Sequence, residues 1–296
     1  MTTTPTVIRS RDNATVKQLI GLVHSSRERK KTGLTVLDGA HLVDAFLRTG
    51  QRPHLVIVAE SASDSADVRV IRQHLLKHQL AVTLVADVLV TEASQLESAA
   101  TVMAVVLTPT ANPIPADAST VLVLEGVQDP GNVGAMLRCA AAFNFSHVLL
   151  GEGTAFAWSP KVLRAAQGAH FVLNIVEGAS VLDFVSRYQG QTLALVPNTK
   201  RKAAQVLADV DLHKPSAILI GNEGAGLSVA VIAAASIRVT IRMPGTMESL
   251  NAASCGAIAM YELCRQRGSL ASAPSPSPSL SLSQSLSLSL SLSQSV

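Results

Sequence analysis

Residues 121–138 have the sequence Val-Leu-Val-Leu-Glu-Gly-Val-Gln-Asp-Pro-Gly-Asn-Val-Gly-Ala-Met-Leu-Arg, in which an apolar strand leads through a glycine-marked turn into an amphipathic helix. We expect the strand to end at Leu124. Asn132 is well placed as the N-cap of the helix, because its side-chain oxygen can accept a free backbone N–H. Gly131 and Gly134 are three residues apart, which does not match the G-x-G-x-x-G pattern of dinucleotide-binding turns. The stretch therefore predicts one strand–turn–helix unit of an α/β fold.

Two further glycine-marked turns follow apolar strands. Ile218-Leu-Ile-Gly-Asn-Glu-Gly-Ala-Gly-Leu-Ser228 has three glycines in six residues, which permits positive φ and a close approach of a ligand to the backbone. Ile241-Arg-Met-Pro-Gly-Thr-Met-Glu-Ser-Leu-Asn251 ends a strand at Pro244 and leads into a last helix, for which Ser249 is a credible N-cap. Ligands of open α/β sheets lie at the carboxyl ends of the strands. The three turns are therefore candidate parts of a site.

Outward from these turns, short apolar runs alternate with helical patterns over residues 119–267. Such runs are typical of strands buried on both faces, so we expect a parallel sheet covered by helices. The last helix is expected to pack through Leu250, Ala253, Ala257 and Tyr261, which recur at helical spacing. Strands are predicted over Val121–Leu124, His147–Leu150, Phe171–Val176, Thr192–Val196, Ala217–Ile220 and Ile237–Met243.

Residues 1–108 contain a smaller alternating set of elements, residues 109–118 a proline-rich linker, and residues 268–296 an uncharged Ser/Leu-rich tail. The tail has nothing from which to build a core, so we expect it to be disordered. In the first segment, strands are predicted over Leu34–Leu37, Leu55–Ala59, Ala81–Val85 and Val102–Leu107, and helices over Val16–Val23, Ala40–Arg48 and Val68–His78.

The composition excludes several classes of protein. The chain has no apolar run of the ~18 residues that a membrane-spanning helix needs, and its first residues lack the features of a signal peptide. Its three cysteines, Cys139, Cys255 and Cys264, form no Cys-x-x-Cys pair and no cluster with histidine. We therefore expect free thiols in a reducing cytoplasm, with no metal site and no membrane partner.

The net charge of +3 is unevenly distributed. Residues 1–31 carry seven cations and two acids, a net of +5, which leaves −2 for the rest of the chain. A basic end on a nearly neutral body suits docking to phosphates. A solvated basic helix end explains the same charge equally well.

Taken in order, the three turns resemble the three motifs of the SpoU family, the TrmH-like branch of the SPOUT methyltransferases. The similarity covers about residues 121–265 and rests on Asn132-Val-Gly-Ala-x-x-Arg138, Gly221-Asn-Glu-Gly-x-Gly226 and Met243-Pro-Gly…Glu248-Ser-Leu-Asn251. Leu37-Asp-Gly-Ala-His-Leu-Val43 in the first segment is similar to the ribosomal-protein-L30e-like substrate domain of many members.

The resemblance implies a SPOUT fold, which is a parallel α/β sheet whose end forms a trefoil knot, preceded by a smaller L30e-like α/β domain. It also implies a homodimer and S-adenosylmethionine held largely by backbone groups, with no metal. The residues expected to bind this cofactor are Gly221, Asn222, Gly224, Gly226, Ile241, Met243 and Leu250.

The reaction implied is methyl transfer to a ribose 2′-OH of RNA, with rRNA preferred over tRNA as substrate. The catalytic residues carried over are Asn132, Arg138, Glu223, Ser249 and Asn251. Family proposals assign activation of the hydroxyl to the arginine that matches Arg138. Because a free arginine stays protonated far above neutral pH, stabilising a developing alkoxide or anchoring phosphate is an equally plausible role.

Two alternatives remain open at this point. A non-catalytic RNA-binding or ribosome-assembly protein could keep the same fold, although binding alone would not need all five polar residues. A dehydrogenase-like α/β enzyme would bind a nicotinamide cofactor, and the glycine spacing disfavours it.

Overall fold

The computed structural model describes residues 6–94, 101–197, 204–247 and 249–268. The tail predicted to be disordered lies outside the described residues, apart from Gly268. Glu248 of the third motif also lies outside them. Among the described residues, no helix has both the length and the apolar character needed to cross a bilayer.

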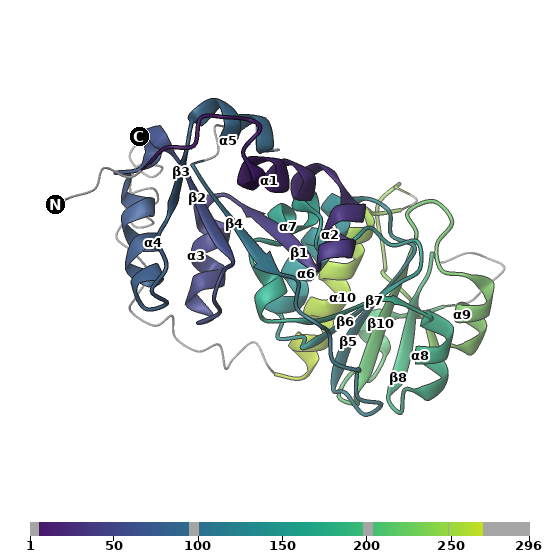
Figure 1. The fold of residues 1–296 in the computed structure, drawn as a ribbon. Helices are drawn as coiled ribbons and strands as arrows, with labels where there is room; N and C mark the ends of the chain where they lie inside the picture. The colour runs from purple at the N-terminus through teal and green to yellow at the C-terminus, as the bar shows by residue number, and fades with distance from the viewer. Residues whose placement is uncertain (1–5, 95–100, 198–203, 248, 269–296) are drawn as a thin grey trace, which may run out of the picture.

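The first part of the chain forms a mixed four-stranded sheet in the order β1-β4-β2-β3 (Figure 1). β4 pairs antiparallel with β1 and β2, and β3 pairs parallel with β2. The four predicted strands are confirmed, as β1 (Leu34–Asp38), β2 (Leu55–Ala59), β3 (Thr83–Val85) and β4 (Val102–Leu107). The helices are α1 (Ala14–His24), α2 (Ser26–Thr32), α3 (Ala40–Arg48), α4 (Ala66–Leu76) and α5 (Asp87–Ala93). The short helices α2 and α5 were not predicted from the sequence. In α2 the sequence Ser-Arg-Glu-Arg-Lys-Lys-Thr has no apolar residue from which a period could be read.

The second part forms a seven-stranded sheet in the order β7-β6-β5-β10-β8-β11-β9, and every pair in it is parallel. The predicted α/β class is thereby confirmed, while the trefoil knot stays a prediction. β7 begins at Asn174 instead of Phe171, because a 3-10 turn occupies residues 169–171. The strands are β5 (Thr120–Glu125), β6 (His147–Gly151), β7 (Asn174–Ala179), β8 (Gln191–Leu195), β9 (Gln205–Val206), β10 (Ser216–Gly221) and β11 (Ile237–Thr240).

Helices cover both faces of the second sheet, as predicted (Figure 1). In β5, Leu122 and Leu124 pack in one buried cluster with α6, α7 and α10, whereas Val121 and Val123 pack in another with α8 and α9. Alternate residues of a strand point to opposite faces, which explains why the run is apolar throughout. The helices are α6 (Pro130–Ala142), α7 (Pro160–Ala166), α8 (Val181–Arg187), α9 (Val229–Ala234) and α10 (Ala252–Gln266).

The predicted packing face of the last helix is wrong. Leu250 precedes α10 and is 40% exposed, and Tyr261 is 47% exposed. The buried side of α10 instead carries Gly256, Ala259, Met260, Leu263 and Cys264. A Cβ on Gly256 would lie 2.9 Å from Ile220 Cδ1, so the absence of a side chain there lets the helix approach the sheet. The spacing of apolar residues does not reveal this face, because the glycine that packs against the sheet has no apolar side chain.

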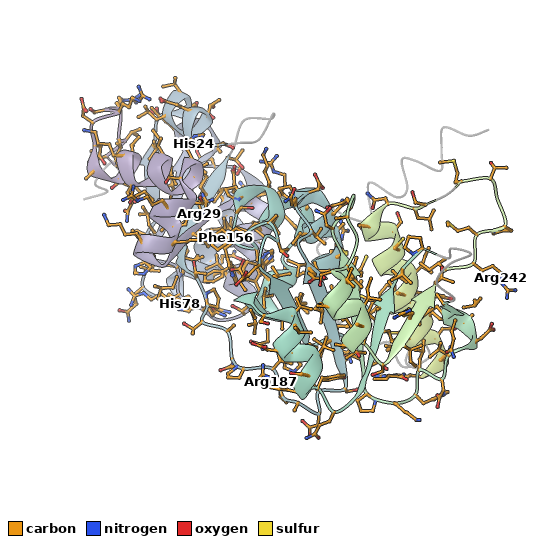
Figure 2. All side chains as sticks on the ribbon, turned by 90° about the vertical axis from the view of Figure 1, so that its right-hand side faces the viewer. His24, Arg29, His78, Phe156, Arg187 and Arg242 are labelled. Atoms are coloured by element: carbon orange, nitrogen blue, oxygen red, sulfur yellow. The ribbon has the colours of Figure 1, made fainter. Side chains whose placement is uncertain are left out.

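The two sheets pack against each other. Thr35 Oγ1 donates a hydrogen bond to the Trp158 carbonyl oxygen at 2.9 Å, and one buried apolar cluster contains residues of both parts. Arg29 of α2 lies over the Phe156 ring, 5.8 Å from its centroid (Figure 2). Asn112, in the stretch that connects the two sheets, and Asn174, the first residue of β7, exchange two hydrogen bonds of 2.9 Å. The proline-rich stretch is thus held against the second sheet, and α2 lies over the loop that follows β6.

Candidate active site

The three glycine-marked turns meet at the carboxyl edge of the second sheet. There Asn132 Nδ2 donates to Glu223 Oε1 at 2.9 Å, and Asn251 Nδ2 donates to Asn132 Oδ1 at 2.9 Å. Three of the five predicted catalytic residues therefore form one hydrogen-bonded chain. It joins the start of α6, the loop after β10 and the start of α10.

Both predicted helix caps are wrong. Asp129 caps α6 by accepting a hydrogen bond of 2.7 Å from the Asn132 N–H. Asn251 caps α10 by accepting hydrogen bonds from the N–H groups of Ala253 and Ser254. Asn132 is therefore inside the first turn of its helix, where its side chain is free to bond across the site. Ser249 is exposed and precedes the helix by three residues.

Glu223 is held by neutral donors. Besides Asn132, the backbone N–H groups of Gln128 and Asp129 donate to its carboxylate, each at 3.3 Å. Burial alone would raise the pKa of this carboxyl, but the hydrogen bonds from Asn132 and the backbone outweigh it and lower the pKa overall. Glu223 is therefore a poor base at neutral pH and a good anchor for the Asn132 amide.

The loop after β10 is closed by its own backbone. Asn222 and Gly226 exchange two backbone hydrogen bonds, and Asn222 Oδ1 accepts from the N–H groups of Gly224 and Ala225 at 2.9 Å each. Asn222 Nδ2 also donates to the Gly126 carbonyl oxygen, which links this loop to the loop after β5. Gly226 has a φ of 72°, a conformation that favours glycine.

A cavity of about 350 Å³ opens beside this loop, between the ends of β8 and β11 and the start of α10. This volume is in the range of small-molecule sites. Glu223, Ser249 and Asn251 line it. So do all seven residues predicted to bind the cofactor: Gly221, Asn222, Gly224, Gly226, Ile241, Met243 and Leu250.

One wall of the cavity was not predicted from the sequence. Leu195, Val196 and Pro197 at the end of β8 line it, as do Thr240 and Cys255. An apolar strand end carries no residue type that signals a ligand, so nothing in this stretch distinguished it from core. Burial raises the pKa of the Cys255 thiol, which keeps it protonated near neutral pH.

Arg138 lies apart from the other four residues. It is exposed on α6 and does not line the cavity. Arg138 lies six positions after Asn132, which corresponds to about 9 Å along the axis and a different side of the helix. Among the described residues, no hydrogen bond or ion pair engages its guanidinium.

No group of three or more His, Cys, Asp or Glu side chains that could hold a metal occurs within the described ranges. The site consists of a largely apolar cavity, a loop rich in exposed backbone groups, and the hydrogen-bonded side chains of Asn251, Asn132 and Glu223. These features suit a neutral or organic ligand held by backbone contacts.

Comparison with known proteins agrees with this arrangement. Residues 119–261 match the model of the SpoU rRNA methylase family, and residues 13–104 match that of an MRM3-like substrate-binding domain. The chain is 30% identical over 256 residues to the 23S rRNA (guanosine(2553)-2′-O)-methyltransferase RlmP of Bacillus subtilis, a match that covers 86% of this chain and 98% of the relative.

Solved structures show the same architecture. An RNA 2′-O ribose methyltransferase superposes with a TM-score of 0.74 at 26% identity, covering 88% of this chain and 99% of that one. The SpoU methyltransferase AviRb of Streptomyces viridochromogenes, solved with S-adenosylmethionine, superposes with a TM-score of 0.73 at 28% identity, covering 87% and 99%. From its sequence, its fold and its near full-length match to the Bacillus relative, the chain belongs to the SpoU rRNA methylase family.

Proposed function

We propose that this chain, an RNA ribose 2′-O-methyltransferase that uses S-adenosylmethionine, acts on ribosomal RNA. The observation that supports catalysis at this edge of the sheet is the chain of hydrogen bonds Asn251–Asn132–Glu223, of which Asn251 and Glu223 line the cavity. The rRNA preference is supported by the Bacillus relative, whose name records a 23S rRNA substrate. The match of residues 13–104 to an MRM3-like substrate-binding domain supports a role of this segment in binding the substrate.

The cavity fits the cofactor chemically. Apolar side chains of Leu195, Ile241 and Leu250 suit an adenine ring, and the backbone groups of the Gly221–Gly226 loop suit its polar atoms. When bound, S-adenosylmethionine supplies an electrophilic methyl group on a sulfonium sulfur. The residues predicted to hold it are those of this loop together with Ile241, Met243 and Leu250.

The protein residues must then orient the ribose and compensate the charge that develops on its oxygen. A ribose hydroxyl is a poor nucleophile near neutral pH and loses its proton as it attacks. Glu223 is engaged by Asn132 and two backbone donors, so we assign it to orienting Asn132. Among the described residues no hydrogen bond or ion pair engages the Arg138 guanidinium, so we assign it to anchoring a phosphate of the RNA or stabilising the developing alkoxide. Ser249 and Asn251, at the cavity mouth, position the ribose.

We further propose that residues 1–108 form the L30e-like RNA-binding domain, residues 109–118 the linker and residues 119–267 the catalytic domain. Ion pairs neutralise part of the positive charge of residues 1–31 in the folded chain. Arg9 pairs with Glu60 at 2.6 Å, Arg11 pairs with Glu92, and Lys17 pairs with Asp12 at 2.7 Å.

The cations of this segment that form no ion pair among the described residues lie on α2. Arg27, Lys30 and Lys31 are exposed there, while Arg29 is buried. Lys30 Nζ lies 5.3 Å from the centroid of the Phe156 ring, on the loop that follows β6. β6 is the neighbour of β5, the strand that leads to Asn132. RNA phosphates next to the target ribose are therefore expected to contact α2.

Replacing Arg27, Lys30 and Lys31 together by alanine should weaken RNA binding and reduce the slope of log K against log salt by about 2 to 3. The matched control is the triple alanine variant of Arg9, Arg11 and Lys17. It removes the same charge, but from paired side chains, and should change the slope by less than about 1. Equal effects of the two triples, measured by titration of RNA at several salt concentrations, would contradict a specific role for α2.

We also propose that the chain forms a homodimer through the exposed sides of α6 and α10. Ile258 of α10 is 40% exposed, and the exposed Tyr261 meets Phe143 edge to face, with 6.1 Å between ring centroids. Large apolar side chains grouped on one surface are typical of an interface. Arg138 is exposed on the adjoining helix α6, so a second copy on this surface would lie beside it.

Ile258→Arg should therefore shift the chain from dimer to monomer in sedimentation velocity, because a buried unpaired charge opposes association. Leu182→Arg is the matched control, since Leu182 of α8 is 42% exposed on the opposite face of the sheet. A wild-type chain that sediments as a monomer, or an Ile258→Arg variant that stays dimeric, would refute this interface.

Methyl transfer from labelled S-adenosylmethionine to purified rRNA and tRNA tests the substrate. We expect label in rRNA that lacks the modification and little in tRNA. Label in tRNA alone would overturn the rRNA assignment. Cofactor binding without transfer to either pool would favour the non-catalytic RNA-binding alternative.

A further inference from the structure

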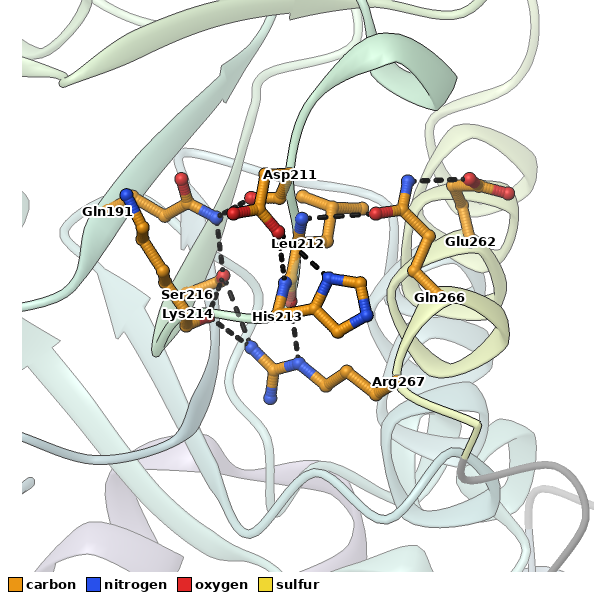
Figure 3. A network of polar contacts seen from close by, with 9 residues as sticks. All are labelled: Gln191, Asp211, Leu212, His213, Lys214, Ser216, Glu262, Gln266 and Arg267. Atoms are coloured by element: carbon orange, nitrogen blue, oxygen red, sulfur yellow. Dashed lines mark hydrogen bonds and ion pairs between the residues drawn. The ribbon is translucent and has the colours of Figure 1, made fainter.

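The carboxyl end of α10 is anchored by Arg267 (Figure 3). Its Nε donates to the Leu212 carbonyl oxygen at 2.7 Å, and its Nη2 donates to the Lys214 carbonyl oxygen and to Ser216 Oγ. Its Nη1 donates to the carbonyl and hydroxyl oxygens of Ser119, at 3.3 and 3.2 Å. A guanidinium has five N–H donors, so these five hydrogen bonds use all of them.

The acceptors around Arg267 are neutral. Among the described residues, no carboxylate forms an ion pair with it. Burial lowers the pKa of its guanidinium, and the side chain is half-buried. Taking a charge out of water without a counterion is costly unless every donor is satisfied. The site is therefore built for the planar fork of an arginine and not merely for a positive charge.

The anchored elements are the same ones that carry the active site at the other edge of the sheet. Ser119 immediately precedes β5, and Ser216 is the first residue of β10. At their carboxyl ends these two strands lead to Asn132 and Glu223, which bond in a chain with Asn251 at the start of α10. Arg267 thus links α10, β5 and β10 at the amino edge of the strands. The hydrogen bonds between Asn251, Asn132 and Glu223 link the same three elements at the carboxyl edge.

The lengths of these elements agree with a two-point attachment. The 15 residues of α10 span about 22 Å, and the six residues of β10 span about 20 Å. Leu212 N–H also donates to Gln266 Oε1 at 3.1 Å, so two successive residues at the helix end grip the same loop. The axial position of α10 is set at both ends.

We propose that Arg267 is a positioning residue for the cofactor site, a role that rests on the proposed function. By fixing the end of α10, it sets the position of Asn251, Ala252 and Cys255, which line the cavity at the other end of the helix. It makes no contact with the cavity itself. Loss of the fork allows α10 to shift along the sheet, and the cavity loses its shape.

The test is the affinity of the full-length chain for S-adenosylmethionine, measured by calorimetry at a temperature where circular dichroism shows each variant to be folded. Arg267→Ala should raise Kd about tenfold or more, and Arg267→Lys should give an intermediate increase because lysine keeps the charge without the fork. The matched control is Arg265→Ala. Arg265 lies on the same helix, is exposed and, among the described residues, pairs only with Glu262, at 2.8 Å. The Kd of Arg265→Ala should therefore stay within about twofold of the wild-type value.

A merely structural role would lower the melting temperature of Arg267→Ala but leave the Kd of the folded protein within about twofold of the wild-type value, which would overturn the proposal. If Arg267→Ala does not fold, Arg267→Lys decides by the same comparison. Failure of the wild-type chain to bind the cofactor would count against the proposed function. Equal binding by wild type and Arg267 variants would count against the positioning role alone.

Discussion

Gly221→Ala should weaken binding of S-adenosylmethionine by about a hundredfold or more. A Cβ at this position would lie 2.1 Å from both the Gly226 carbonyl carbon and the Leu227 nitrogen. These are backbone atoms, so no side-chain rotation relieves the clash, and the hydrogen-bonded pair of Asn222 and Gly226 must open. Because that pair closes the loop lining the cavity, we expect a loss of about a hundredfold or more in affinity.

Gly21→Ala is the control for this substitution. Gly21 lies inside α1, and nothing is within 4 Å of a Cβ built there. Its Kd should therefore match that of the wild type, as measured by calorimetry, with folding checked by circular dichroism. A folded Gly221→Ala chain with near-normal affinity would show that the cofactor does not depend on this loop.

Arg138→Ala should lower the rate of methyl transfer by about 10²- to 10³-fold, the range seen when one donor to a developing oxyanion is removed. Cofactor affinity should stay within about twofold, because Arg138 does not line the cavity. The expected pattern is a loss in kcat without a loss in cofactor binding.

Arg138→Lys sharpens the same experiment. It keeps the positive charge but cannot make the bidentate contacts of a guanidinium, so we expect a rate between those of wild type and alanine. Single-turnover measurement with saturating cofactor separates the chemical step from binding. A near-normal rate for Arg138→Ala would remove this residue from the mechanism.

The strands of the fold could be predicted where a continuous apolar run ends at a glycine-marked turn. The runs at residues 121–124 and 217–220 gave the two central strands, since a strand buried on both faces has to be apolar throughout. A strand without such a run could not be predicted. β9 consists of only Gln205 and Val206, and its pairing with β11 is a tertiary contact that no local pattern records.

The polar residues of the site could be found from the sequence, but not their partners. Asn132 and Ser249 were each expected to cap a helix, and only the fold decides that Asp129 caps α6 and Asn251 caps α10. The bond between Asn132 and Asn251 joins residues 119 positions apart. Likewise, Arg267 contacts loops that are distant in sequence, so its partners could not be predicted from the sequence alone.

Mapping of the methylated position tests the proposed reaction most directly. Unmodified rRNA is incubated with the chain and labelled S-adenosylmethionine. One part is digested to nucleosides for mass spectrometry, and another is cleaved with alkali to locate the modified position. We expect label in a single 2′-O-methylated nucleoside, at a position that resists alkaline cleavage, and labelling about 10²- to 10³-fold slower with Arg138→Ala. Label on a base, or no label from a chain that binds the cofactor, would contradict the proposed reaction.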